Sequence, residues 1–269
     1  MNNIFDIKRF GNYLLYDLRR AKNNYGLSML VVGLLPFIIF IITEFISLII
    51  GKGVILLPDF AKFLSFVIAC IIVILGFGAK AYGELTSKQA GSSFLMLPAS
   101  IPEKWLSLFL ITCVAAPVAL FALLFLSDGV LGLFFPNSYG DSVLRTTFTR
   151  DLLEGMTTLR EEGVYINLFG ILVIDWITNI LTFTLGAICF KKAKVAKTLL
   201  CLFALGMIIS TLFAILLGNG AVDPEQFFKR FDSPERAISS FNWYLNITYI
   251  CTLAILLGGI FYRLRTIKH

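Results

Sequence analysis

The chain has 269 residues, of which 58% are hydrophobic and 15% are charged, and its formal net charge is +6. A soluble domain of this length would not need so much apolar surface, so the composition indicates an integral membrane protein. The cations are scattered beside apolar runs and form no patch interleaved with stacking aromatic residues, so we expect no nucleic-acid partner. The single histidine is His269, which excludes histidine-based catalytic triads and zinc sites with histidine ligands.

The first predicted element is an amphipathic helix within residues 1–27. Its apolar positions recur at steps of three and four, and most of its cations lie on the opposite face. We expect this helix to lie in the lipid headgroup layer as an elbow before the first span. A simple anchor and an elbow that braces a cytoplasmic partner remain open as its role. The apolar positions are Ile7, Phe10, Leu14, Leu18 and Ala21.

Six apolar runs follow, each close to the roughly 20 residues that an α-helix needs to cross about 30 Å of hydrocarbon. They lie at Ser28–Ile50, Lys62–Ala79, Trp105–Leu126, Leu168–Phe190, Thr198–Leu217 and Leu245–Tyr262. The predicted fold is therefore all-α, with six transmembrane helices and an N-terminal interfacial elbow helix. We expect one membrane domain over residues 1–269, made of the segment 1–27, the bundle 28–262 and the tail 263–269.

Lysine and arginine predict the orientation, because positively charged loops resist translocation. With the N-terminus inside, fifteen of the 23 lysines and arginines lie on the cytoplasmic side, mostly in short loops and tails beside the spans. Both termini are therefore expected in the cytoplasm. The first long outer loop is expected at Ser127–Asn167.

The segment between the second and third runs, Tyr82–Lys104, is the most informative connection. It carries apolar side chains on a short polar stretch, which is costly unless they contact lipid or a partner. Ser100 and Glu103 have the spacing of a capping box that opens the next helix, and Pro98 ends the preceding turn.

This segment, together with the elbow and the six runs, resembles the membrane subunit of an ABC transporter of the type-2 exporter class. The resemblance implies a permease subunit of the bacterial cytoplasmic (inner) membrane that works as a homodimer or beside a paralogous permease. It also implies that a separate ATP-binding cassette subunit docks on this segment. The residues expected to dock or position that partner are Glu84, Leu85, Lys88, Gly91, Phe94, Leu95, Leu97, Pro98, Glu103 and Lys104.

Ionisable groups inside spans are candidate functional residues, because a charge is expensive in hydrocarbon. Asp175 lies near the middle of the fourth run, and Asn179 and Thr182 follow it at helical spacing. This polar face is expected to point into the bundle. It either lines a translocation path or hydrogen-bonds a neighbouring helix or subunit. Glu44, in the outer third of the first run, is expected either to reach the membrane interface or to pair with Lys52 or Lys62.

The chain contains no Gly-x-x-x-x-Gly-Lys-Ser/Thr loop, so any ATP-driven activity requires another polypeptide. We therefore expect a transport subunit that is not itself an enzyme, with no catalytic residue, cofactor or metal. Two alternatives remain. An ion-coupled secondary transporter would use Asp175 and Glu44 as ion sites, and a non-transporting scaffold or immunity protein would need no ATPase.

Overall fold

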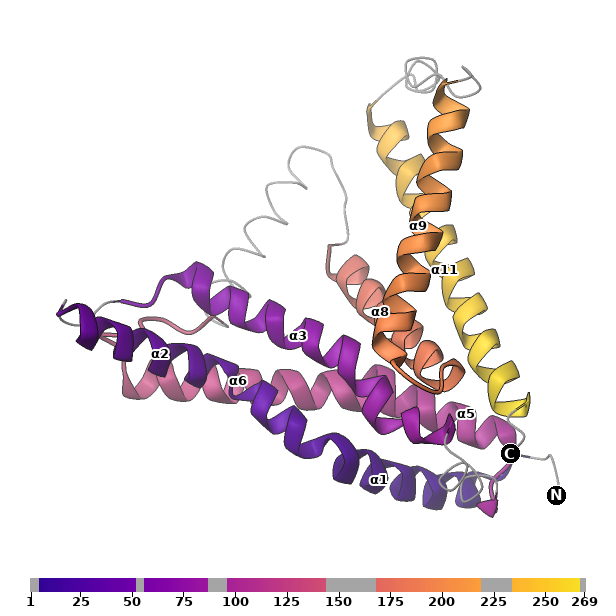
Figure 1. Ribbon diagram of the computed structural model, residues 1–269, viewed down its shortest axis with the longest axis horizontal. Helices are drawn as coiled ribbons and strands as arrows, with labels where there is room; N and C mark the ends of the chain where they lie inside the picture. The colour runs from indigo at the N-terminus through magenta and orange to yellow at the C-terminus, as the bar shows by residue number, and fades with distance from the viewer. Residues whose placement is uncertain (1–4, 52–55, 87–95, 144–167, 219–233, 267–269) are drawn as a thin grey trace.

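We describe the fold from a computed structural model, over residues 5–51, 56–86, 96–143, 168–218 and 234–266. These residues form α-helices joined by turns, and contain no strand. The helices are α1 (Ile7–Gly33), α2 (Leu35–Ile50), α3 (Asp59–Ala81), α5 (Ile101–Leu110), α6 (Ala116–Phe134), α8 (Leu168–Cys189), α9 (Lys194–Gly218) and α11 (Pro234–Thr266), with a 3-10 turn η1 (Gly83–Thr86) and a π-helical turn η2 (Ile111–Ala115) (Figure 1).

The chain is an all-α membrane protein. Six helical stretches within the described residues are long and apolar enough to cross a membrane, and each contains or overlaps one of the predicted spans. Five of the six predicted spans were shorter than their helical stretches, whereas the fourth ran one residue past α8, which ends at Cys189. The third span is part of a continuous helical stretch over Ile101–Phe134, and α11 continues to Thr266.

The N-terminal helix is not separated from the first span at residue 27 as predicted. It continues to Gly33 and meets α2 at Leu34. The break follows from Pro36, which has no N–H to donate to the carbonyl one turn before it. Together α1 and α2 cover 44 residues, or about 66 Å of helix, which is twice the hydrocarbon thickness. The cationic first half of α1 therefore extends beyond the apolar layer.

α1 also uses a face that the sequence pattern did not single out. Two of the predicted apolar positions, Ile7 and Leu18, are exposed and free to meet lipid. The face that packs on α3, α5 and α6 is a row at steps of three and four residues that shares only Ala21 with the predicted positions. The row comprises Tyr13, Asp17, Ala21, Tyr25, Met29 and Val32.

The third span contains a π-helical turn, η2, between α5 and α6. Pro117, the second residue of α6, cannot donate a hydrogen bond to Cys113, four residues earlier, and the helix widens locally instead of breaking. Beyond this turn α6 runs to Phe134, and Ser127 and Asp128 are buried helical residues. The prediction that an outer loop starts at Ser127 was therefore wrong.

We call α1, α2, α3, α5, α6 and α8 the body. Its apolar core includes Phe66, Val73, Leu120 and Leu181. α3 and α8 approach closely at Gly78, where an added Cβ would lie 2.7 Å from the Cα of Thr184. A glycine is required there because any side chain would push the two helices apart.

α9 and α11 form a second region, the arm. In Figure 1 both helices leave the layer of α1, α2, α3 and α6 at a steep angle. In the most apolar stretch of α9 only 6% of the residues are buried within the chain, and in that of α11 only 11% are. Within the described residues, the arm contacts the body through α8, α3 and α5.

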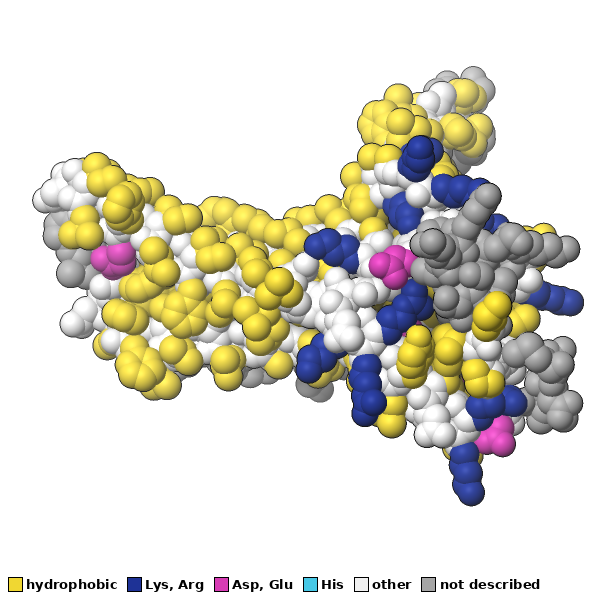
Figure 2. Space-filling view, turned by 60° about the horizontal axis from the view of Figure 1, so that its bottom comes forward, with side chains coloured by type: hydrophobic (Ala, Val, Ile, Leu, Met, Phe, Trp, Pro, Cys, Tyr) yellow, Lys and Arg dark blue, Asp and Glu magenta, His cyan; other side chains and the backbone are white. Residues whose placement is uncertain are grey.

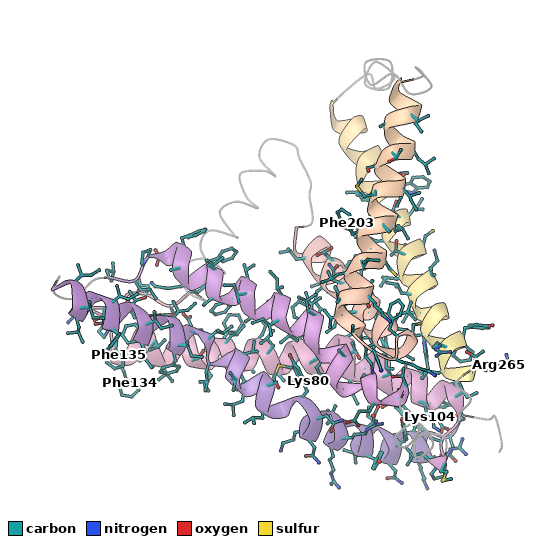
Figure 3. The ribbon with its side chains drawn as sticks, viewed as in Figure 1. Lys80, Lys104, Phe134, Phe135, Phe203 and Arg265 are labelled. Atoms are coloured by element: carbon teal, nitrogen blue, oxygen red, sulfur yellow. The ribbon has the colours of Figure 1, made fainter. Side chains whose placement is uncertain are left out.

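The two ends of the molecule differ in charge. Lysines and arginines gather around one end, and apolar side chains cover the other (Figure 2). Lys104 and Arg265 lie toward the first end, and Phe134 and Phe135 toward the second (Figure 3). The start of α1 and the end of α11 lie at the first end (Figure 1), which we call the cationic end.

Candidate functional site

The start of the Tyr82–Lys104 segment is anchored in the body at the cationic end. Tyr82 follows α3 and is buried, and its hydroxyl donates a hydrogen bond of 3.2 Å to the Asp17 carboxylate of α1. Ser107 of α5 donates to the same oxygen over 2.8 Å. Burial, with a further contribution from Asp17, raises the pKa of Tyr82 well above its ordinary value, so the phenol keeps its proton. Asp17 therefore joins α1, α3 and α5 in one buried cluster, the Asp17 cluster.

The end of the segment is held by a second buried contact. Glu103 is fully buried and forms an ion pair of 2.6 Å with Arg9 of α1. Its carboxylate also accepts hydrogen bonds from the backbone N–H groups of Asp6 and Ser100. The Ser100 contact is the glutamate half of the predicted capping box. Donor groups of three residues, Arg9, Asp6 and Ser100, thus converge on one carboxylate.

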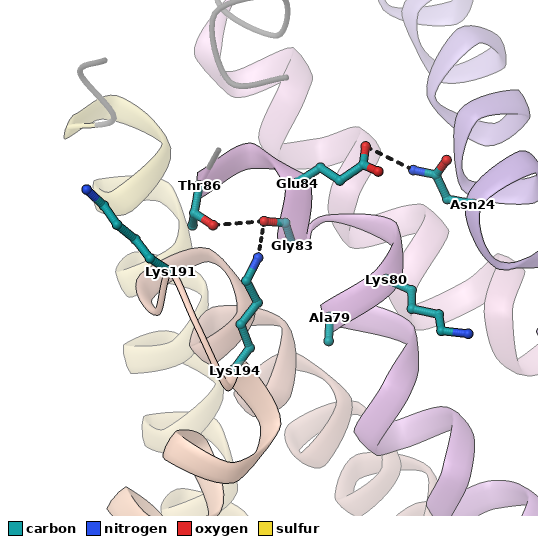
Figure 4. A pocket seen from close by; sticks show the side chains of 8 residues that line it. All are labelled: Asn24, Ala79, Lys80, Gly83, Glu84, Thr86, Lys191 and Lys194. Carbon is teal, nitrogen blue, oxygen red and sulfur yellow. Dashed lines mark hydrogen bonds between the residues drawn. The ribbon is translucent and has the colours of Figure 1, made fainter. Parts of the chain in front are cut away.

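Glu84 lies on the surface between these anchors. Its carboxylate is 3.6 Å from Arg20 and accepts a hydrogen bond from Asn24, both on α1. The neighbouring Gly83 carbonyl accepts a hydrogen bond from Lys194 at the start of α9. These residues border a cavity of about 500 Å³, shown in Figure 4. The cavity is lined by Asn24, Ala79, Lys80, Gly83, Glu84, Thr86, Lys191 and Lys194.

The structure divides the ten predicted docking residues into three groups. Glu84 and Pro98 are exposed and Leu97 is half-buried, so these three are accessible. Leu85, Glu103 and Lys104 are buried within the chain, Leu85 in the apolar core and Glu103 against Arg9, so their side chains lie beneath the surface that faces a partner. The other four lie outside the described residues: Lys88, Gly91, Phe94 and Leu95.

The predicted polar face of α8 does not point into the bundle. Asp175 is exposed on the surface of the chain, and Asn179 donates a hydrogen bond back to the Asp175 carbonyl over 2.9 Å. Thr182 likewise bonds to the carbonyl of Thr178, on its own helix. The buried side of α8 is apolar around Ile180 and Leu181, which turns Asp175 away from the body.

A second polar cluster lies at the opposite end from Tyr82. Lys62 is buried, forms an ion pair of 2.7 Å with Asp59, and lies 4.9 Å from the centre of the Tyr139 ring. The Tyr139 hydroxyl donates to the buried Asp128 over 2.6 Å. The predicted pairing of Glu44 with Lys62 was therefore wrong, and Lys52 lies outside the described residues.

Two anchoring residues were not identified from the sequence. Asp17 belongs to the row of α1 that also contains Tyr13, Ala21 and Tyr25, so its spacing of four residues was the available signal. Arg9 is one of the cations predicted on the face opposite the apolar positions of the elbow, and nothing in the sequence links it to Glu103, 94 residues away.

Comparisons with known proteins identify no relative. No protein-family model, no curated protein and no solved structure matches this chain.

Proposed function

We propose that this chain is the membrane permease subunit of an ATP-driven, ABC-type exporter. A separate ATP-binding subunit docks on the Tyr82–Lys104 segment, and closure of that subunit rocks the helices of the permease. The resemblance of this segment to the type-2 exporter class is the starting point, and the anchoring of the segment at both ends supports the mechanism.

The anchoring is the observation that carries the proposal. A docking segment transmits force only if it is fixed to the spans that must move. Tyr82 fixes its start to α1 and α5 through the Asp17 cluster, and Glu103 fixes its end to α1 through Arg9. Between these anchors, Glu84, Met96 and Pro98 are exposed. Such an arrangement can carry a push on the surface directly into α1, α3 and α5.

The position of Asp175 supports a pair of permeases. An exposed carboxylate in the middle of a span is expensive against lipid. A second permease copy or a paralogue, packed against α8, would supply polar partners or enclose a hydrated path beside this residue. Asn179 and Thr182 then belong to the same path.

The proposed location is the bacterial cytoplasmic membrane, with the cationic end inside. The positive-inside rule favours this orientation, because lysines and arginines gather at that end (Figure 2), where α1 starts and α11 ends (Figure 1).

The experiment is affinity purification of the tagged chain from its native membrane in mild detergent. Met96 is 82% exposed at the cationic end, and an aspartate there would place an unpaired charge in the docking surface. We expect Met96→Asp to reduce the co-purifying ATP-binding subunit by about tenfold or more. Phe94→Asp, in the same segment, is expected to act likewise.

Leu133→Asp is the matched control. Leu133 is also 82% exposed but lies in α6 near Phe134, far from the docking segment, so its change should leave the partner bound. Absence of any nucleotide-binding protein from the unmutated preparation would favour the secondary-transporter or scaffold alternative.

A further inference from the structure

The cavity at the cationic end is formed where four helical elements meet, one of them α1, which contributes Asn24. Ala79 and Lys80 come from the last turn of α3, Glu84 from η1, and Lys191 and Lys194 from the turn into α9. Lys80 follows the apolar part of α3 and Lys194 precedes that of α9. The cavity therefore lies just beyond the ends of two membrane spans, at the height of the lipid headgroups.

The lining carries an excess of positive charge. Lys80, Lys191 and Lys194 contribute three cations, against the single carboxylate of Glu84. That carboxylate lies 3.6 Å from Arg20, which offsets its negative charge. A negative ligand in the cavity would therefore meet a net attraction.

The lysines keep donor capacity for a ligand. The Lys194 ammonium donates to the Gly83 carbonyl and that of Lys80 to the Ser28 hydroxyl over 2.7 Å, which leaves protons on each for further bonds. Lys191 is exposed. In Figure 4 Lys191 and Lys80 extend to either side of Lys194, so their flexible side chains border the cavity from both flanks.

The start of α9 adds to the attraction. The first turn of a helix carries partial positive charge and normally contains acidic or capping residues. The first turn of α9 contains no acid, and lysines occupy positions 191, 192, 194 and 197 around it. These lysines repel one another and the positive end of the α9 dipole, and an anion bound beside them would offset this repulsion.

We propose that this cavity binds a phosphate-bearing anion, in the membrane the headgroup of an anionic phospholipid. Phosphate presents several acceptor oxygens to the ammonium groups, and a volume of about 500 Å³ accommodates a whole headgroup. Basic pockets between spans at the cytoplasmic surface recognise such headgroups. The site is independent of the proposed function, although Glu84 lies in both surfaces.

The test is binding to the intact purified protein. One arm uses nanodiscs of phosphatidylglycerol against nanodiscs of phosphatidylcholine, with lipid retained by the protein measured after delipidation and exchange. The other arm titrates inorganic phosphate and follows thermal unfolding. We expect selective retention of phosphatidylglycerol, about 5-fold weaker in Lys191→Gln and about 25-fold weaker in Lys191→Gln/Lys194→Gln.

Lys192→Gln is the matched control, because it removes the same charge from the same turn outside the cavity lining. Lys191 is exposed, so its change leaves the fold intact even if the double variant does not fold. Stabilisation by inorganic phosphate that requires Lys191 would support the same site with free phosphate as its source. Equal losses for Lys192→Gln and Lys191→Gln, or no preference for phosphatidylglycerol and no response to phosphate, would overturn the proposal.

Discussion

α8 and α9 follow one another along the chain, and both are apolar enough to span a membrane. In the most apolar stretch of α8, however, 39% of the residues are buried within the chain, against only 6% in that of α9. α8 packs along α3 through Gly78 and contributes Leu181 to the core, whereas residues 201–212 of α9 are all exposed. Apolar composition therefore indicates that a helix lies in the membrane. Which other helices it packs against depends on small residues and on interhelical contacts.

The body and the arm also differ in what holds them together. In the body, buried polar contacts such as the Asp17 cluster and the Arg9–Glu103 pair join α1 to α3 and α5. The arm is joined to the body near the C-terminal end of α11. There the Trp105 indole donates a hydrogen bond to the Leu257 carbonyl over 3.1 Å, and the Arg263 guanidinium donates one to the Ile188 carbonyl over 3.3 Å. Most described residues of the arm away from this junction are exposed on the chain.

The largest expected effect comes from removing the centre of the Asp17 cluster. Asp17→Ala leaves the hydroxyls of Tyr82 and Ser107 buried without their acceptor, at a cost of about 3 kcal/mol in the free energy of unfolding. The measurement is the fraction of monodisperse protein remaining after heating in detergent. Asp17→Asn is the matched control, since its amide oxygen still accepts a hydrogen bond. An alanine variant as stable as the parent chain would contradict the role of Asp17 as an anchor.

A smaller effect separates the core of the body from the arm. Leu181 of α8 is 0% exposed, so Leu181→Ala creates a cavity and should lower the free energy of unfolding by about 2 to 3 kcal/mol. Leu200 of α9 is 69% exposed, so Leu200→Ala should change the free energy of unfolding of the single chain by less than about 0.5 kcal/mol. The same heating assay compares the two. Equal losses would show that α9 is packed as tightly as α8.

The spans were predictable because each depends on a local property, the length of an apolar run. Their boundaries depend on contacts made elsewhere. α6 extends past Leu126 because Ser127 bonds to the Gly33 carbonyl and Asp128 accepts a hydrogen bond from Tyr139. Gly33 and Tyr139 lie outside the third apolar run, so the pattern of that run could not predict these contacts.

The candidate site was only partly predictable for the same reason. The capping-box spacing of Ser100 and Glu103 is local and correctly marked the start of a helix. The same glutamate was assigned to a partner, because its pairing with Arg9 is a contact between distant parts of the chain. Asp175 was predicted to face inward from its polarity alone, whereas the packing of α8 is decided by the larger apolar side around Leu181.

The most direct test of the central claim is ATP hydrolysis measured on the tagged chain, purified with its companions and reconstituted into proteoliposomes. The proposed function predicts hydrolysis that co-purifies with the unmutated chain, falls to background in Met96→Asp and persists in Leu133→Asp. Background hydrolysis for the unmutated chain, in a preparation with no nucleotide-binding protein, would contradict it.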